Sequence, residues 1–308
     1  MALSDSTPTP LIAPDLPAGS RRRTSVGAVV RVVILAAMAL AFIIPILALI
    51  LAPTRSIANM NLGGLAVGTW GNVAYAWRQI MGFDSGQFLG WFGNTAIAVG
   101  GGAALAVVLS VPSGYAMARL RFRGRRVLLF TTLLLMVMPN TVLVIPLFLE
   151  VSSVGLLNTI WPLIVIFGFY PFGVYLAYIH YRTALPLEIV EAARMDGLSE
   201  VGIFSQIAVP LSQQAVALVG FFAFVAGWTN FFLPFVLLSK TTAQTLPVGL
   251  LTIISASQLV NPEEGLPIKI YMPELALAAV ISMLPVLVVF LLAQRYLQRG
   301  QMLGAVKG

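Results

Sequence analysis

Residues 191–210 read EAARMDGLSEVGIFSQIAVP, a charged, glycine-broken stretch between two long apolar ones. The surrounding sequence is so apolar that the 308-residue chain is 59% hydrophobic and only 9% charged, with a mean hydropathy of +0.94. Soluble domains carry about 25% charged residues, so this chain has too few to cover a water-facing surface. The composition therefore predicts an integral membrane protein whose surface is largely covered by lipid.

Six apolar segments are long enough to cross a bilayer, whose hydrocarbon core of about 30 Å needs roughly 20 helical residues. They cover residues 26–52, 90–118, 127–149, 159–180, 211–238 and 273–294. The first is longer than the apolar part of a signal peptide, which has about 7–15 residues, so we expect an uncleaved helix. Proline and asparagine interrupt several segments, which favours a bundle around a pathway over a simple anchor.

The basic residues predict which ends of these helices face the cytoplasm, because cytoplasmic loops carry an excess of Arg and Lys. With the N-terminus inside, the outer segments hold only Arg55, Arg78, Lys240 and Lys269. The inner segments then hold Arg21, Arg22, Arg23, Arg119, Arg121, Arg123, Arg125, Arg126, Arg182, Arg194, Arg295, Arg299 and Lys307. Both termini and the quoted stretch are therefore expected on the cytoplasmic side. The net charge of +7 would suggest a nucleic-acid partner in a soluble protein. In a membrane protein we expect the same excess of Arg and Lys to set the orientation of the helices across the bilayer.

The expected organisation is an all-α membrane domain between two tails. Residues 1–25, rich in Pro, Ser and Thr, predict a disordered cytoplasmic N-terminal tail. Residues 26–295 form the six-helix transmembrane domain, with a cytoplasmic loop at 186–210, and residues 296–308 form a cytoplasmic C-terminal tail. The chain has no cysteine, which excludes disulfides and thiolate chemistry.

The first part of the loop predicts a short helix. Pro186 suits a first helical turn, where its missing N–H costs nothing, and the acidic Glu188 and Glu191 favour the early turns. The small Ala192 lets another surface approach the backbone closely. Gly197 suits the left-handed residue that ends a helix.

The second part of the loop predicts another short helix, from Glu200 to Ile207, capped by Ser199 and ended by Pro210. Its expected apolar stripe consists of Val201, Phe204 and Ala208. The pair could lie flat at the lipid interface or dock on a protein. Interfacial helices prefer Lys and Arg on the polar face, so the acidic face here favours a protein partner.

These residues resemble a known motif. Glu191-Ala192-Ala193, three residues, Gly197, nine residues, Ile207 and Val209-Pro210 resemble the EAA loop of binding-protein-dependent ABC transporter permeases. The family commonly has Leu where this chain has Val209. Further stretches resemble the carbohydrate-uptake, maltose-permease-like branch: SGYAMARLRFRGRR (113–126), MPNTVLVIPLF (138–148), GLLNT (155–159), GWTNFFLPFVLLS (227–239), TLPVGL (245–250) and AQRYLQRGQMLGAVKG (293–308).

The resemblance implies a six-transmembrane-helix permease in a bacterial cell (inner) membrane. It also implies two ATPase subunits, a second homologous permease, an extracytoplasmic substrate-binding protein and a carbohydrate substrate. The loop would be the coupling element that docks on an ATPase. Its coupling residues would be Glu188, Glu191, Ala192, Ala193, Asp196, Gly197, Ile207 and Pro210.

The chain lacks the residues of an ATP site of the P-loop type, in which a Gly-Lys pair precedes Ser or Thr. Its only lysines, Lys240, Lys269 and Lys307, follow Ser, Ile and Val. ATP and Mg²⁺ are therefore expected on partner chains, and we predict a subunit with no enzymatic or metal site of its own. The single histidine, His180, would need partners that the sequence does not supply.

Candidates for the solute path are amides and aromatics within or beside the apolar segments, because sugars use amide hydrogen bonds and aromatic faces. They are Asn94, Asn140, Tyr170, Trp228, Asn230 and Phe231. The family often has an acidic residue after a Trp-Asn pair, and this chain has Trp228-Thr229-Asn230 instead. The alternative function is a secondary transporter or channel that works without an ATPase. It would predict intramembrane charges, which are scarce here.

Overall fold

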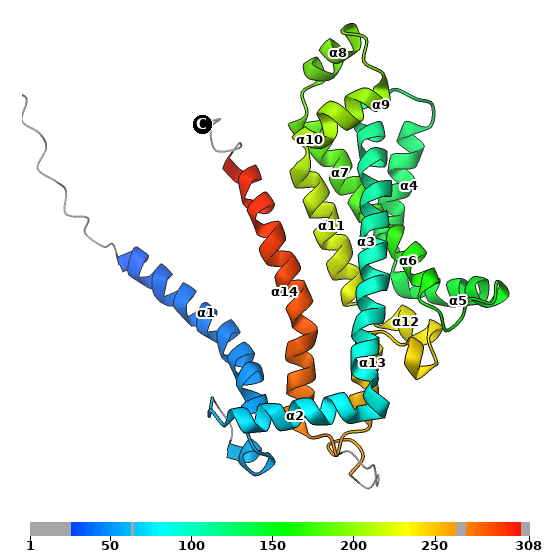
Figure 1. The fold of residues 1–308 in the computed structure, drawn as a ribbon. Coiled ribbons are helices and arrows are strands. Elements are labelled where there is room, and N and C mark those ends of the chain that lie inside the picture. Colours follow the sequence, from blue (N-terminus) through cyan, green and yellow to red (C-terminus); the bar gives the residue numbers. More distant parts are fainter. Residues whose placement is uncertain (1–25, 63–64, 263–268, 303–308) are drawn as a thin grey trace, which may run out of the picture. The chain divides into compact units, whose positions relative to one another are not determined.

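The computed structural model describes residues 26–62, 65–262 and 269–302, with side chains left undescribed at residues 26, 60–62 and 297–302. Every regular element in these ranges is helical, as predicted. The α-helices are α1 (Val26–Leu51), α2 (Trp70–Gly82), α3 (Gln87–Arg119), α4 (Arg125–Val137), α5 (Val144–Ser153), α6 (Trp161–Gly168), α7 (Pro171–Ala184), α8 (Leu187–Met195), α9 (Glu200–Ile203), α10 (Val209–Leu211), α11 (Gln213–Trp228), α12 (Phe232–Leu237), α13 (Leu246–Ser255) and α14 (Met272–Met302). Figure 1 shows their course.

The chain forms two units, residues 1–47 and 48–308. The described part of the first unit is most of α1, an apolar helix with Pro45 near its end. The second unit holds everything from α2 to α14. The predicted tail at 1–25 lies outside the described residues, and α14 continues as a helix to Met302, beyond the predicted end of the membrane domain at residue 295.

The described residues contain four helices long and apolar enough to cross a membrane: Gly27–Thr54, Trp70–Arg119, Trp161–Ala184 and Met272–Tyr296. Two bent pairs raise the number to six if each pair is one span. Arg125–Val137 and Asn140–Ser153 meet at 95°, and Glu200–Leu211 and Gln213–Trp228 meet at 78°. The first bend lies at the predicted interruption, Pro139 and Asn140.

The region 53–89, predicted only as a mixed connection, contains the helix α2. Three consecutive residues with positive φ, Asp84, Ser85 and Gly86, turn the chain sharply from α2 into α3. In Figure 1 α2 lies at one end of the bundle and α8 and α9 at the other. The two ends of α3 therefore lie at opposite ends of the second unit.

Helix α3 is the centre of the bundle, and it packs against α6, α7, α11 and α13. Small residues allow these close approaches, as is usual between membrane helices. A Cβ on Gly114 would lie 2.5 Å from the Cβ of Ala177 on α7, and one on Gly102 would lie 2.5 Å from the Cβ of Phe167. On α13, Gly249 makes room for the ring of the fully buried Trp91.

We predict that Gly114→Ala weakens the contact between α3 and α7. The added methyl group meets the backbone of Ala177 and Tyr178 as well as a side chain, so the helices must move apart. Overpacking of this kind costs about 1–3 kcal/mol. The measurement is thermal unfolding of the detergent-purified protein.

Gly100→Ala is the matched control, because it lies on the same helix, is exposed and has nothing within 4 Å of its added Cβ. Gly100→Ala should leave the unfolding temperature unchanged or slightly raised. Equal unfolding temperatures for the two variants would contradict a tight α3–α7 contact.

Candidate functional site

The 186–210 segment forms two short helices joined by a capped turn, as predicted. The first, α8, begins directly after Pro186, which has an extended backbone (φ −60°, ψ 140°) and therefore precedes the helix instead of lying in its first turn. Glu188 lies in the first turn, where a carboxylate favours the helix dipole.

A Schellman motif ends α8. Gly197 has φ +83°, its N–H donates to the carbonyl of Arg194 at 3.0 Å, and the N–H of Leu198 donates to the carbonyl of Ala193 at 3.1 Å. These two bonds satisfy carbonyls that the helix end would otherwise leave without partners. A Cβ on Gly197 would have nothing within 4 Å, so the backbone conformation alone requires glycine here.

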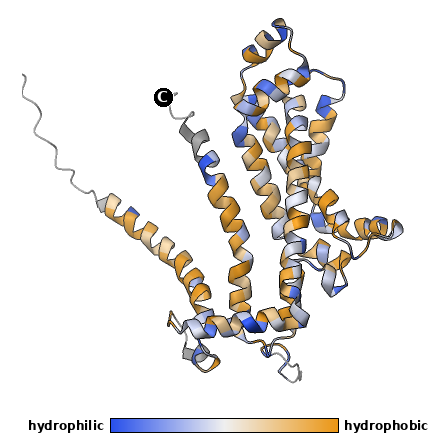
Figure 2. Ribbon diagram, in the orientation of Figure 1, coloured by the Kyte–Doolittle hydropathy of each residue, from blue (hydrophilic) through white to orange (hydrophobic). Residues whose placement is uncertain are grey.

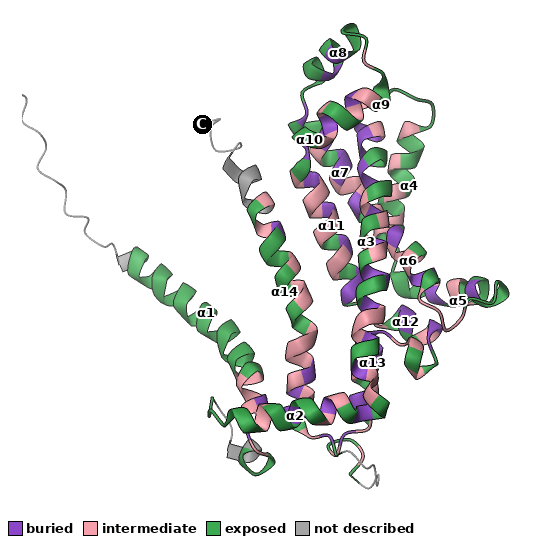
Figure 3. Cartoon of the chain, in the orientation of Figure 1, coloured by how far each residue is buried: buried purple, intermediate pink, exposed green. Residues whose placement is uncertain are grey.

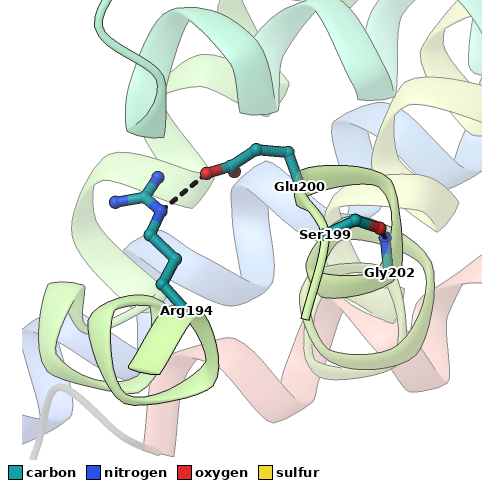
Figure 4. A network of polar contacts seen from close by, with 4 residues as sticks. All are labelled: Arg194, Ser199, Glu200 and Gly202. Atoms are coloured by element: carbon teal, nitrogen blue, oxygen red, sulfur yellow. Dashed lines mark hydrogen bonds and ion pairs between the residues drawn. The ribbon is translucent and has the colours of Figure 1, made fainter. Parts of the chain in front are cut away.

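The second helix is clamped to the first across this turn. Ser199 caps α9, with its Oγ accepting from the N–H of Gly202 at 3.2 Å. Arg194 Nε lies 2.6 Å from Glu200 Oε1, and this hydrogen bond raises the pKa of Arg194. Figure 4 shows both contacts side by side. The turn is thus fixed by backbone bonds, a cap and an ion pair together.

The second helix is longer than predicted. After α9 the chain forms a π-helical turn at Phe204–Ala208 and continues through Val209–Leu211, so the prediction that Pro210 ends the helix is wrong. Pro210 has no N–H to donate to the carbonyl of Gln206, and the widened turn lies directly before it. The break comes at the buried Ser212, where α11 turns away.

One face of the segment packs on the bundle. Val190, Ala193, Ile203 and Ala208 are buried in one cluster with residues of α3 and α7. Ile207 is half-buried against the same cluster. The predicted stripe is partly wrong, because Val201 is 75% exposed and Ile203 takes the inner position. The placement of Ala193 also differs from the expected contact with another protein, since it faces inward.

The opposite face is open and mixes acids with apolar side chains. Glu188, Glu191, Ala192 and Asp196 are exposed, as expected of residues that contact a partner. Met195 is 88% exposed, and Ile189 on the same helix is exposed as well. In Figure 3 the outward side of α8 is almost entirely exposed. Of the residues predicted to couple, Glu188, Glu191, Ala192 and Asp196 therefore face outward, whereas Ala193 and Ile207 pack against the bundle.

Arg119 and Tyr115 attach the segment to the bundle, and neither was singled out from the sequence. Arg119 Nη2 donates to the carbonyls of Tyr181 at 2.7 Å, of Arg182 at 3.3 Å and of Leu185. It therefore caps the end of α7 just before α8 begins. One turn earlier, the Tyr115 ring lies 5.4 Å from Tyr181 and 5.2 Å from Phe204. The i, i+4 spacing in SGYAMARLRFRGRR was the available signal, since it places both on one helical face.

The solute-path candidates are scattered. Asn94 Nδ2 donates to the carbonyls of Thr242 and Gln244, and Trp228 Nε1 donates to the carbonyl of Ser282 at 2.9 Å, so these two hold helices and loops together. Asn230 Oδ1 accepts from the N–H of Leu233 at 3.4 Å.

The other three candidates lie elsewhere. Phe231 stacks on Phe235, Tyr170 lies at the break between α6 and α7, and Asn140 is exposed after α4. Two cavities in the described part of the chain, one at the α3–α4 turn and one beside α2, are lined by none of the six.

Comparison with known proteins identifies the family. Residues 110–302 match the family described as the binding-protein-dependent transport system inner membrane component. The chain belongs to this family. The membrane prediction and the resemblance to ABC importer permeases are thereby confirmed, and the match includes the whole 186–210 segment. Members are non-catalytic membrane subunits of importers whose ATPase is a separate chain, so this permease is not an enzyme.

Curated relatives extend over most of the permease. It is 29% identical to the arabinooligosaccharides transport system permease protein AraQ of Halalkalibacterium halodurans, over 86% of this chain and 91% of that protein. It is 32% identical to the galactooligosaccharides transport system permease protein GanQ of Bacillus subtilis, over 74% and 77%. A crystal structure of a bacterial ABC transporter that imports the acidic polysaccharide alginate has the same fold, with a TM-score of 0.75, 23% identity and coverage of 91% and 99%.

We predict that Arg119→Gln loosens the junction between α7 and α8. The variant loses a cation at three carbonyls of a helix end, and hydrogen bonds to charged groups contribute about 1.5–3 kcal/mol. Backbone amides of residues 183–195 should exchange hydrogen for deuterium faster in the purified protein.

Arg182→Gln is the control, because it removes the same charge nearby from an exposed side chain that contacts the hydroxyl and the ring of Tyr178 and none of the three carbonyls. Exchange at residues 183–195 should stay as in the unaltered protein. If both variants exchange alike, Arg119 does not fix this junction.

Proposed function

We propose that the chain forms, with a second permease, the translocation path for a sugar or oligosaccharide. We further propose that separate ATPase subunits drive it through the 186–210 segment. The family match supports a permease of a binding-protein-dependent importer, and the named substrates of several relatives support the substrate class. The substrates named for these relatives are arabinooligosaccharides, galactooligosaccharides and maltodextrin.

The outward face of α8 carries the proposal for coupling. This face exposes Glu188, Glu191, Ala192 and Met195. The turn that follows α8 is capped and ion-paired, and the inner face of the segment packs onto α3 and α7. A rigid element passes a push onward, whereas a flexible loop would absorb it. Switching a two-state transporter from 1:99 to 99:1 needs about 5.5 kcal/mol of differential binding, and the sequence has no P-loop to supply it.

The proposed orientation places both termini and α8 in the cytoplasm. Its support is the shared position of α8 and the arginine-rich turn between α3 and α4, which lie at the same end of the second unit in Figure 1. Arg119, the last residue of α3 before that turn, donates to the carbonyl of Leu185 just before α8. A positive-inside arrangement of the turn therefore also puts α8 on the cytoplasmic side.

An ion-coupled transporter without an ATPase is the weaker candidate. The acid best placed for ion coupling, Glu274, is buried at the start of α14, where its Oε2 accepts from the backbone N–H of Tyr271 at 2.9 Å. That contact caps the start of α14, so the carboxylate of Glu274 stabilises the helix and gives no support to a role in ion coupling. For the solute, the proposal keeps Asn140, Tyr170, Asn230 and Phe231 as contacts and assigns Asn94 and Trp228 to packing.

We predict that a tagged chain, extracted in mild detergent from cells that express its neighbouring subunits, brings with it an ATPase and a second permease. Mass spectrometry of the eluate identifies both. An oligomer of this chain alone would contradict coupling to a separate ATPase.

We predict that Glu191→Lys and Gly197→Pro each abolish ATP-driven uptake while the protein stays in the membrane. The first reverses a charge on the outward face of α8, and the second removes the left-handed turn and the N–H bonded to Arg194. Both should also lose the copurified ATPase. Uptake of labelled maltodextrin and galactooligosaccharides provides the transport readout.

Glu150→Lys is the control, an equal charge reversal at an exposed position on α5, away from α8. It should keep the ATPase and the transport rate. Normal ATPase retention in Glu191→Lys and Gly197→Pro would refute the docking role of the segment. If the unaltered chain retains the ATPase normally but takes up none of the tested sugars, only the proposed substrate class is refuted.

A further inference from the structure

The turn between α3 and α4 has a cluster of arginines that the proposed transport function does not explain. Residues 119–126 read RLRFRGRR, with five arginines and no acid. The turn lines an open, shallow cavity of about 370 Å³. Its lining residues are Arg121, Phe122, Gly124, Arg125, Arg126 and Val127.

The cationic side chains of this cavity lack partners of their own. Arg125 makes only long bonds of 3.5 Å, to the carbonyls of Leu120 and Ala118. Within the described part of the chain, Arg121 and Arg126 have no hydrogen bond and no ion pair. Gly124, with φ +91°, starts α4, whose first N–H groups add to the positive potential. The cavity is therefore matched to an anion.

An apolar stripe continues from the cavity along α4. Val127, Phe130, Leu134 and Val137 follow a helical spacing, and all four are more than half exposed. The opposite face of α4 packs on α7, with Leu129 against the inner cluster. Figures 2 and 3 show the outer face of α4 as both hydrophobic and exposed. A water-facing helix would carry polar residues on this face, so the exposed apolar stripe fits contact with hydrocarbon.

We propose that this cavity and stripe bind one anionic phospholipid, with its headgroup phosphate among Arg121, Arg125 and Arg126 and an acyl chain along α4. The ligand must carry an anion and a hydrocarbon tail at one short separation, since Val127 belongs to both the cavity and the stripe. A free phosphate would use only the cavity. A docked soluble protein would leave the membrane-facing stripe unexplained.

The test uses the full chain, with the subunits that accompany it, in nanodiscs of an equal mixture of phosphatidylcholine and phosphatidylglycerol. Native mass spectrometry after transfer to detergent counts the retained lipids. We expect retained phosphatidylglycerol in preference to phosphatidylcholine. Arg121→Gln and Arg126→Gln should each weaken retention roughly fivefold, the expected loss for one cation near an anionic lipid.

Arg123→Gln is the matched control, since Arg123 is an exposed arginine of the same turn that does not line the cavity. It should retain phosphatidylglycerol as the unaltered chain does. An equal loss in Arg123→Gln would show a diffuse charge effect and overturn the site. Unfolding temperatures of all variants are measured alongside, and a loss confined to correctly folded Arg121→Gln and Arg126→Gln supports it.

Two further outcomes would overturn the proposal. If inorganic phosphate displaces the lipid completely at equal concentration, the acyl stripe contributes nothing and the site is one for a free anion. If Arg121→Gln and Arg126→Gln keep the lipid but lose the copurified ATPase, the turn is a protein contact. Leu134→Gln, on the stripe and outside the cavity, should also weaken lipid retention without altering phosphate binding.

Discussion

The contact between Arg119 and the end of α7 is the interaction on which the polar end of the second unit depends. A helix end leaves carbonyls without intrahelical partners and carries a partial negative charge, so a guanidinium is the best available cap. Here the cap comes from α3, the central helix, and it reaches Tyr181 in the last turn of α7 and Leu185, two residues before α8 begins. Helices α3 and α7 and the start of α8 are thereby joined at one point.

A second contact completes this joint. Tyr115, one turn before Arg119, lies against Phe204 of the second loop helix as well as Tyr181 of α7. The second short helix and the residues just before the first are therefore tied to α3 through two different side chains. A force applied to the outward face of α8 would reach α3 and α7 together, and the Arg194–Glu200 pair keeps the two short helices from moving independently.

The sequence predicted those features of the loop that depend on local chemistry. Gly197 and Ser199 act through their own backbone or through residues three positions away, so spacing alone located the turn and the cap. The inward position of Ala193 and the outward position of Val201 depend on how the whole segment lies on α3 and α7, which no local pattern encodes. The same is true of Pro210: a π turn absorbs its missing N–H, and the chain breaks at Ser212 instead.

Two surfaces of opposite charge lie close together at this end of the protein, and Arg119 stands between them. The turn of residues 121–126 is purely cationic, whereas α8 and the turn after it present Glu188, Glu191 and Asp196. If both faced the same neighbour, that neighbour would need opposite charges at a short spacing. The apolar stripe that continues from the arginines belongs in hydrocarbon, and the acidic face of α8 does not, because anionic headgroups would repel it. If the proposed lipid site exists, the cationic turn would hold this end of the bundle against lipid, and the proposed push on the acidic face of α8 would act against that fixed point.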